Sequence, residues 1–338
     1  MKRTFLAAAG GLLALGLTSF LIPRDGVTFA PSVGTKLTKN FSGQVELSLD
    51  SMRMLMNGEE QDMQMDEEPG GTGSYTLVVT DHFKALEQGR PTDLTRSFVE
   101  VSGSAESNDG DSSQGSLDEL EGETVHFVWD ADAGAYDVTY EDGEGEEDVL
   151  NVLVPDMDFR PLLPRGEVSD GDEWEIGGND ILKVLLPGAD VRNAAASGVE
   201  IGGDPIPEKA LELLDKFLES SKATCTYVGT TETDGVSLAE IGVKGKVGGT
   251  TEFDPSEFGE EGMDFNAEML VNLTINLDFE GTLLWNVKGG HFQSFTMEGQ
   301  GGLDVHMTAH IAEMDMDWEN EMSASMTIEQ KATAEPAE

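Results

Sequence analysis

Two histidines four residues apart, His306 and His310, form the clearest candidate metal pair in this sequence. On a helix, positions i and i+4 share one face, so the two imidazoles could hold one ion. The surrounding residues alternate between apolar and polar, which indicates a strand, where residues four apart lie about 13 Å from each other. Met307 also stands where the helical zinc-protease pattern needs Glu. We therefore predict no metal site, and two solvated histidines beside Asp304 and Thr308.

Two aspartates, Asp130 and Asp132, precede Gly134 in a spacing that suggests a calcium loop. A helix-flanked calcium loop has Gly at its sixth position, and here that position is Ala135. Asp and Gly are also ordinary turn-forming residues, and strand-like segments flank them. This pattern favours the tip of a hairpin over a calcium site.

Methionines are spaced two apart in two segments, which is the spacing of one face of a strand. Apolar packing explains them because Met fills irregular gaps, and a copper-binding cluster is the alternative. These residues are Met52, Met54, Met56, Met314, Met316, Met322 and Met326. The sequence contains no nucleophile elbow and no phosphate-binding glycine motif, so we predict no catalytic residue, no cofactor and a protein that is not an enzyme.

The 338-residue chain is strongly acidic, with 66 Asp and Glu against 20 Lys and Arg and a formal net charge of −46. Such a surface repels phosphate backbones, so nucleic acid is not an expected partner. Solubility in a salty medium explains the charge, and a divalent-cation surface is the alternative. Cys225 is the single cysteine, so no intramolecular disulfide can form.

The stretch from Met269 to Trp285 alternates strictly, with apolar residues at odd positions and mostly polar residues between them. This is the pattern of a strand with one buried face, and it is much longer than a strand of about 5–6 residues. The parity does not change at Gly281, so Gly281 is a bend in one strand or the middle of a three-residue turn.

Other segments predict the remaining elements of a single antiparallel β domain spanning residues 27–330. A phase change between Leu49 and Met52 predicts a β-bulge. A stripe of apolar residues predicts one principal helix over about 205–221. Acidic, apolar-poor stretches at about 102–123, 141–148 and 251–264 are expected to be mobile loops, and 331–338 a disordered tail.

The N-terminal segment 1–26 has Lys2 and Arg3 before an apolar run from Phe5 to Ile22. This pattern predicts a signal peptide, with an uncleaved N-terminal anchor helix as the alternative. Either way we expect the protein to be exported, in the periplasm, at the cell surface or outside the cell. No membrane insertion is expected beyond this segment.

The order of features resembles a known group. An export leader and a long run of strands are followed by Leu163-Pro164, then Gly171-Asp172-Glu173-Trp174, and one helix. Asp234-Gly235 lies between strands, and Gly289-Gly290 comes near the end. This arrangement resembles uncharacterised exported β-rich proteins of bacterial envelopes and, loosely, lipoprotein carriers with a half-barrel over a helix. No lipid-attachment cysteine follows the leader.

We therefore expect a mainly β protein with a large curved antiparallel sheet, half-barrel or clam-like, and one principal helix packed on its concave face. A dry concave face beside a helix leads us to predict binding of an apolar or amphipathic small molecule. The candidate lining residues are Leu277, Phe279, Leu283, Trp285, Leu214 and Phe217. The alternatives are that these side chains fill a core, and that the protein is a structural or interaction protein of the envelope.

Overall fold

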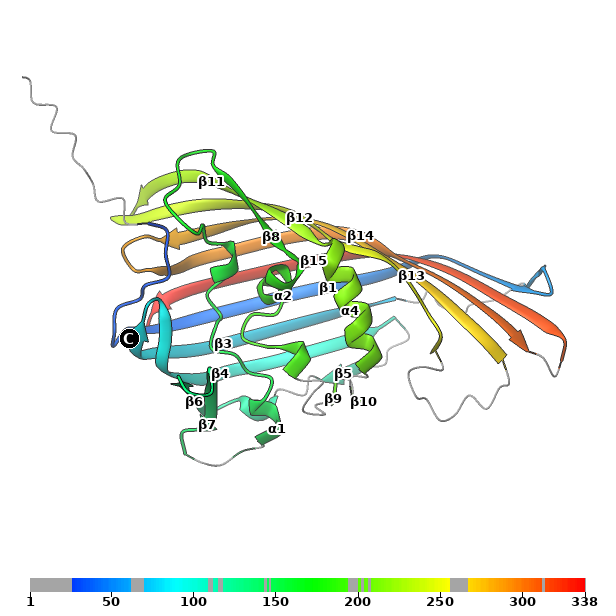
Figure 1. Cartoon of the computed structure of the whole chain (residues 1–338), viewed down its shortest axis with the longest axis horizontal. Helices are drawn as coiled ribbons and strands as arrows, with labels where there is room; N and C mark the ends of the chain where they lie inside the picture. The colour runs from blue at the N-terminus through cyan, green and yellow to red at the C-terminus, as the bar shows by residue number, and fades with distance from the viewer. Residues whose placement is uncertain are drawn as a thin grey trace, which may run out of the picture.

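The computed structural model describes residues 26–61, 70–108, 112–114, 118–142, 145, 147–193, 200–201, 204–205, 208–255, 267–311 and 314–337. The predicted leader therefore lies outside the described residues, except for Gly26. The described chain is dominated by one 13-stranded antiparallel sheet (Figure 1). The predicted fold class, mainly β with a large curved antiparallel sheet, is confirmed.

The strands of the main sheet are β1 (Lys36–Met56), β2 (Glu59–Gln61), β3 (Gly70–Glu87), β4 (Arg90–Ser107), β5 (Ser112–Gln114), β6 (Thr124–Asp130), β7 (Ala135–Tyr140), β8 (Glu173–Gly177), β11 (Lys222–Thr233), β12 (Val236–Phe253), β13 (Ala267–Asn286), β14 (His291–Ile311) and β15 (Met316–Pro336). They lie in the order β7-β6-β4-β3-β1-β15-β14-β13-β12-β11-β8, while β2 pairs with β1 and β5 with β4. A second, two-stranded sheet contains β9 (Glu200–Ile201) and β10 (Asp204–Pro205).

The four central strands are unusually long because the alternation of apolar and polar residues continues along each of them, interrupted only by β-bulges. β13 has 20 residues and β1, β14 and β15 have 21 each. At about 3.3 Å per residue, each spans roughly 65–70 Å. Gly281 lies within β13, so it belongs to one strand rather than to a turn. The predicted bulge in β1 is also confirmed, because its register against β15 shifts between Leu49 and Ser51.

The predicted disordered tail is wrong over residues 331–336, which form the last part of β15. These residues pair with the start of β1, where Phe41 lies opposite Ala332 and Lys39 opposite Ala334. Ala332 and Ala334 are buried. The short polar segment is ordered because strand β1, about 290 residues earlier in the chain, offers it a partner.

The helical segments differ in part from the prediction. The principal helix α4 covers Glu208–Ser220, while residue 205 belongs to β10. A second helix, α2 (Gly178–Leu185), was not predicted. The other helical turns are α1 (Glu147–Leu150), η1 (Asp118–Leu120) and η2 (Arg160–Leu162). None of the described helices is long and apolar enough to cross a membrane.

The three predicted acidic loops are shorter than expected. β4 continues through Ser107, β5 occupies 112–114, η1 occupies 118–120 and β12 continues through Phe253. Residues 147–148 belong to α1. The ends of these strands consist mostly of polar, solvent-exposed residues. Backbone hydrogen bonds to the neighbouring strand stabilise them there. Most of the 251–264 segment lies outside the described residues.

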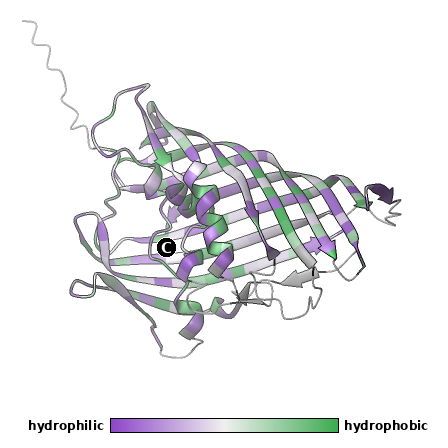
Figure 2. Ribbon diagram, turned by 45° about the vertical axis from the view of Figure 1, so that its right-hand side comes forward, coloured by the Kyte–Doolittle hydropathy of each residue, from purple (hydrophilic) through white to green (hydrophobic). Residues whose placement is uncertain are grey.

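The sheet has an inner face, which carries α2 and α4 (Figure 1), and an opposite, outer face. The alternate residues that belong to the outer face are mostly polar, and Figure 2 shows the resulting bands of hydropathy along the strands. On β13 and β14 the inner face consists of the odd-numbered residues up to the bulge near Trp285. We call the part under the helices the covered half, exemplified by β13 Phe279–Trp285. We call the part beyond α4 the open half, exemplified by β13 Met269–Ile275.

Candidate functional site

Three charged residues occupy inner-face positions of the covered half, where the strand pattern requires apolar residues. Lys39 lies between Leu37 and Phe41 on β1, and all three are buried. Asp81 lies in the same setting on β3, between Val79 and Phe83, and Arg96 on β4, between Leu94 and Phe98. This interruption of the apolar phase is a sequence signal that our sequence analysis did not use.

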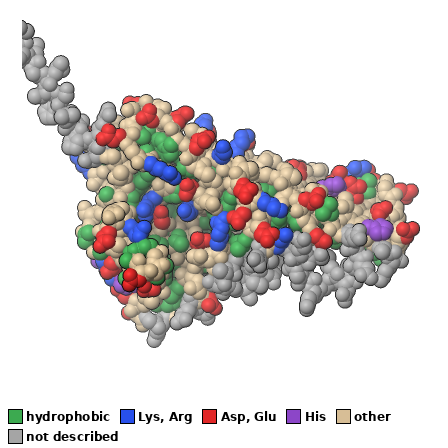
Figure 3. All heavy atoms as spheres, in the orientation of Figure 1, with side chains coloured by type: hydrophobic (Ala, Val, Ile, Leu, Met, Phe, Trp, Pro, Cys, Tyr) green, Lys and Arg blue, Asp and Glu red, His purple; other side chains and the backbone are tan. Residues whose placement is uncertain are grey.

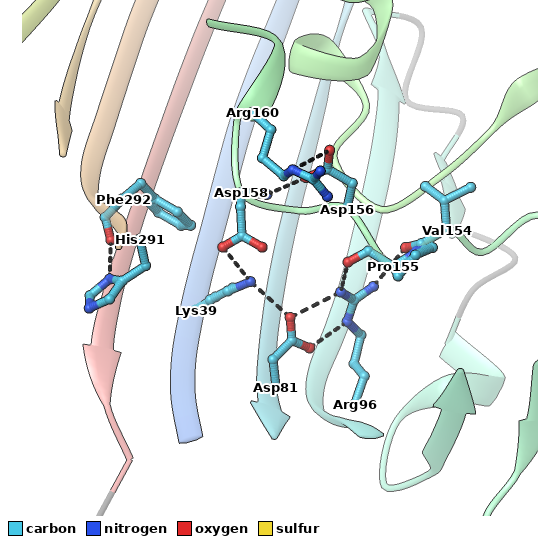
Figure 4. A network of polar contacts seen from close by, with 10 residues as sticks. All are labelled: Lys39, Asp81, Arg96, Val154, Pro155, Asp156, Asp158, Arg160, His291 and Phe292. Carbon is cyan, nitrogen blue, oxygen red and sulfur yellow. Dashed lines mark hydrogen bonds and ion pairs between the residues drawn. The ribbon is translucent and has the colours of Figure 1, made fainter. Parts of the chain in front are cut away.

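The three residues form a buried ionic network with Asp158, which lies on the segment that crosses the inner face (Figure 4). Lys39 Nζ lies 2.8 Å from an Asp81 carboxylate oxygen and 2.8 Å from Asp158 Oδ1. Arg96 donates from Nε and Nη2 to the two Asp81 oxygens, at 2.7 Å and 3.0 Å. Its guanidinium also donates to the backbone oxygens of Val154 and Pro155. Two cations thus balance two carboxylates.

The network controls the protonation of its members. Burial favours a higher pKa for Asp81, but Arg96 and Lys39 hold the pKa of that carboxyl below its usual value. Burial opposes the charged form of Lys39, yet Asp158 and Asp81 together raise the Lys39 pKa above normal. For Asp158 burial dominates, and its pKa is raised to about 6. Lys39 therefore stays protonated, which suits a structural cation and not a nucleophile.

An aromatic cluster holds the same segment against the sheet. Phe159 has a left-handed backbone conformation, with φ 52°, which directs its ring onto the strands. Its centroid lies 4.3 Å from that of Phe295, 5.1 Å from that of Phe292 and 6.0 Å from that of Phe41. Ionic and aromatic contacts therefore hold residues 153–162 against strands β1, β4 and β14 and keep the covered half closed.

The open half presents a different inner face, which is largely apolar and more exposed than the covered half. Beyond α4, no described helix lies on it, and Figure 2 shows apolar bands that continue across these strands. Most of the larger apolar side chains of this surface are half-buried or exposed, while Val271, Ala309, Ala324 and Asn320 on the same face are buried. The half-buried or exposed ones include Val45, Leu47, Leu49, Met52, Met54 and Met56 of β1, Trp318, Met322 and Met326 of β15, Leu303, Val305 and Met307 of β14, and Met269, Leu273 and Ile275 of β13.

Glycines in β3 explain why part of this surface is the most accessible. Val45 lies opposite Gly73 and Leu47 opposite Gly71. Because glycine has no side chain, neither residue has a cross-strand neighbour on that side. Val45 is 44% exposed and Leu47 37% exposed. Val45 and Leu47 therefore leave apolar surface exposed beside the methionines of β1 and β15.

The six predicted ligand-lining residues do not form one open site. Leu283 and Trp285 are completely buried in the covered core, and Phe279 lies in the same core with its ring packed over Gly245. Leu277 is buried nearer to the open half. The remaining two are on α4, where Phe217 is buried near Gly249 and Leu214 is half-buried. The structure thus places most of them as core side chains, and the accessible residues of the same face lie further along the strands.

A cleft of about 1190 Å³ lies between α2, α4, β8 and the segment at 154–161. Arg192 crosses it, in contact with Asp215 and donating to Asn179 Oδ1 at 3.0 Å. Charged side chains, including Glu175, Glu219 and Lys222, and apolar side chains, including Met157, Ile176 and Leu182, line the rest. The cleft is therefore mixed in character, with an ion pair across it.

On the outer face, cross-strand partners surround the two histidines. His310 Nδ1 lies 2.8 Å from an Asp317 oxygen, and His306 Nε2 lies 2.9 Å from Glu319 Oε1. The histidines therefore do not share a site, as the strand spacing predicted. However, His306, Glu319 and Glu321 place ligand atoms within 4.8 Å of one another. Sequence reasoning missed this group because the two glutamates come from the next strand.

The Asp130 turn is the hairpin tip that we predicted. Asp130 Oδ1 accepts hydrogen bonds from the backbone nitrogens of Asp132 and Ala133, at 2.8 Å and 3.1 Å. Gly134 has φ 68°, a conformation that glycine adopts without strain. The carboxylate thus stabilises the turn between β6 and β7.

No protein-family model matches the chain, and no curated protein matches it. The solved structures to which this chain is similar include OprB of Pseudomonas putida at high pH, with 10% identity over 88% of this chain and 94% of that chain, at a TM-score of 0.18. OccK7 (OpdD) of Pseudomonas aeruginosa has 9% identity over 88% of this chain and 99% of that chain, at a TM-score of 0.17. A mutant of the Rh. blastica porin has 6% identity over 86% of this chain and 99% of that chain, at a TM-score of 0.16. TM-scores this low establish neither a shared fold nor a function.

Proposed function

We propose that this protein is an exported binding protein that holds the apolar part of an amphipathic molecule on the open half of its inner face. The observation that carries the proposal is the half-exposed apolar surface itself. It continues the inner face of the covered core past the bulge in β1 between Leu49 and Ser51, and none of the described helices lies on it.

The side chains of the open half suit a ligand with a flexible hydrocarbon chain. Met52 lies opposite Met322 and Leu47 opposite Met326, so thioether side chains from two strands meet across the face. Met has three rotatable bonds and a polarisable sulfur, which lets one surface adapt to different apolar shapes. Exposed apolar patches of this kind mark interaction sites on soluble proteins.

Trp318 provides a direct assay because it lies on this surface, opposite Met56. We would titrate the protein with a single-chain phosphocholine that carries bromine on its acyl chain, below its critical micelle concentration. Bromine quenches tryptophan at short range, so binding on the open half should quench Trp318 saturably. Trp318→Phe should remove most of the quenching, because Trp285 is completely buried and the other two tryptophans, Trp129 and Trp174, lie on β6 and β8 near the edges of the sheet.

A matched pair of double variants distinguishes the two faces. Met52→Gln with Met322→Gln changes a cross-strand pair on the inner face, and Ser51→Gln with Ser323→Gln changes the adjacent pair on the outer face. The methionine variant should weaken binding about tenfold or more, since about 1.4 kcal/mol of lost apolar contact is a factor of ten. The serine variant should bind normally.

Equal binding by both variants, or no saturable quenching, would contradict the proposal and favour a structural or interaction protein of the envelope. Mass spectrometry of an organic extract of natively purified protein would identify a retained ligand. Export is tested separately by the intact mass of the mature protein, which should lack about 30 N-terminal residues. A full-length, membrane-associated species would instead support the anchor.

A further inference from the structure

We propose that His306, Glu319 and Glu321 form a surface site for one divalent transition-metal ion on the outer face, with Zn²⁺ as the natural probe. Their ligand atoms, one imidazole nitrogen and two carboxylate oxygens, lie within 4.8 Å of one another. This site is independent of the proposed ligand surface, because it uses the opposite face of the same strands.

The register of two strands holds the three residues together. His306 on β14 lies directly opposite Glu321 on β15, and Glu319 lies opposite Thr308, one step along the same face. The His306 and Glu319 side chains already meet, with Nε2 and Oε1 2.9 Å apart. Since both strands are long and paired on both sides, small side-chain rotations are enough to close the three ligands around an ion.

The donor set indicates the class of metal. Imidazole nitrogen and carboxylate oxygen suit zinc, nickel and copper, whereas calcium takes six to eight oxygens. Three protein ligands leave one position of a tetrahedral site for water or a further ligand. The methionines of β15 cannot contribute to this site. Met322 and Met326 lie on the inner face of the sheet, whereas Glu319 and Glu321 lie on the outer face.

The side chains are accessible to an ion from solution. His306 is 42% exposed, Glu319 40% and Glu321 48% as side chains. Figure 3 shows histidine and acidic side chains together at the end of the molecule formed by the tips of the long strands. The strongly negative surface raises the local concentration of cations there.

Arg53 competes with a metal ion for the carboxylate of Glu321. It lies opposite Glu321 on β1, with Nη1 3.5 Å from Glu321 Oε2 and Nε 3.6 Å from Glu60. Its positive charge compensates the carboxylates without an ion and repels an incoming cation. Removing this charge should therefore tighten metal binding.

His310 is a control built into the same strand. Its Nδ1 contacts the carboxylate of Asp317, at 2.8 Å. Among the described residues, the group of His306, Glu319 and Glu321 is the one that brings three ligand atoms within 4.8 Å of one another. A site formed by this group should thus depend on His306 and not on His310.

The test is calorimetric titration of the chelator-treated, full-length chain with zinc chloride near pH 7.5. We expect one saturable site per chain in the wild type. His306→Gln, Glu319→Gln and Glu321→Gln should each weaken it by at least about tenfold, by analogy with losses of supporting groups at metal sites. His310→Gln should leave it unchanged, and Arg53→Gln should tighten it.

A second readout separates ligation from general attraction to an acidic surface. Zinc should shift the imidazole NMR resonances of His306 in the wild type and in the Arg53→Gln variant at substoichiometric ion. Equal zinc affinity in His306→Gln and His310→Gln would overturn the proposal. Equally, weak multi-site binding that none of the variants changes would show that dispersed carboxylates take up the ion.

Discussion

Leu283 and Leu273 lie on the same strand and on the same face, yet they have different surroundings. Leu283 is completely buried among the aromatic side chains of the covered half, whereas Leu273 is half-buried in the open half between Thr251 and Val305. The alternation around the two residues is the same. Periodicity therefore specifies which face of the sheet a residue occupies. The segment at 153–162, which crosses the inner face, determines which part of that face is buried.

The two halves also handle charge differently. In the covered half, Lys39 and Asp81 are completely buried and form a balanced network with Arg96 and Asp158. Along the outer face, Lys246 and Asp278 make an equally short ion pair, at 2.7 Å, in water. Buried pairs need complete partners, while exposed pairs contribute little. The same substitution should therefore have a large effect on stability in the covered half and a small effect at an exposed position.

The largest effect should come from Lys39→Met. It leaves Asp158 buried without its cation, so we expect a loss of about 3–5 kcal/mol in the free energy of unfolding. The matched control is Lys246→Met, which breaks the exposed pair and should cost about 1 kcal/mol or less. Urea denaturation measures both. Similar losses in the two variants would show that the network does not fasten the covering segment.

The next effect compares the two leucines directly. Leu283→Ala opens a cavity in a closed core and should cost about 2–5 kcal/mol. Leu273→Ala removes a side chain that water already reaches, so its cost should be about 1 kcal/mol. If denaturation finds the two costs equal, the open half must be covered in solution, and the proposed binding surface would not be free.

A pH-dependent effect is expected from Asp158. Its pKa is about 6 in the folded protein and about 3.9 when unfolded, so the folded state binds more protons between these values. Its contribution to stability therefore increases as the pH falls from 7 towards 4.5, by up to about 1.4 kcal/mol per pH unit. The Asp81 pKa is held below normal, so Asp81 loses its contribution only at lower pH.

Asp158→Asn should remove this pH-dependent gain, because asparagine does not titrate. Denaturation of the wild type and the variant at several pH values between 4.5 and 7 gives the difference between the two profiles. Parallel profiles would mean that Asp158 does not take up its proton in this range.

The smallest effect concerns the overall charge. With 66 acidic and 20 basic residues, most carboxylates repel one another, and the folded chain holds them closer together than the unfolded chain. Raising NaCl from 0.1 M to 1 M shortens the screening length from about 10 Å to about 3 Å. The melting temperature should rise by a few degrees, and by the same amount in Lys39→Met, whose network is buried. A flat or falling melting temperature would imply that a cation or partner already compensates the acids.

Much of the fold could be predicted because it depends on neighbours in the chain. Alternation marked the long strands, and the phase shift after Leu49 marked the bulge. The missing parity change left Gly281 as a bend in one strand or the middle of a three-residue turn, and the structure shows it inside β13. The apolar stripe located α4 to within a few residues. Helix α2 was missed because its eight residues make only about two turns, too short a segment to establish a helical period.

What the tertiary structure alone decided depends on residues far apart in sequence. Strand β1 gives residues 331–336 a partner and so orders a segment that its own composition predicted to be frayed. The segment around Asp158 meets Lys39 only because it crosses the inner face, and β15 brings Glu319 and Glu321 beside His306. Periodicity is a local property, whereas covering a face, pairing a buried charge and assembling ligands require long-range contacts that the topology supplies.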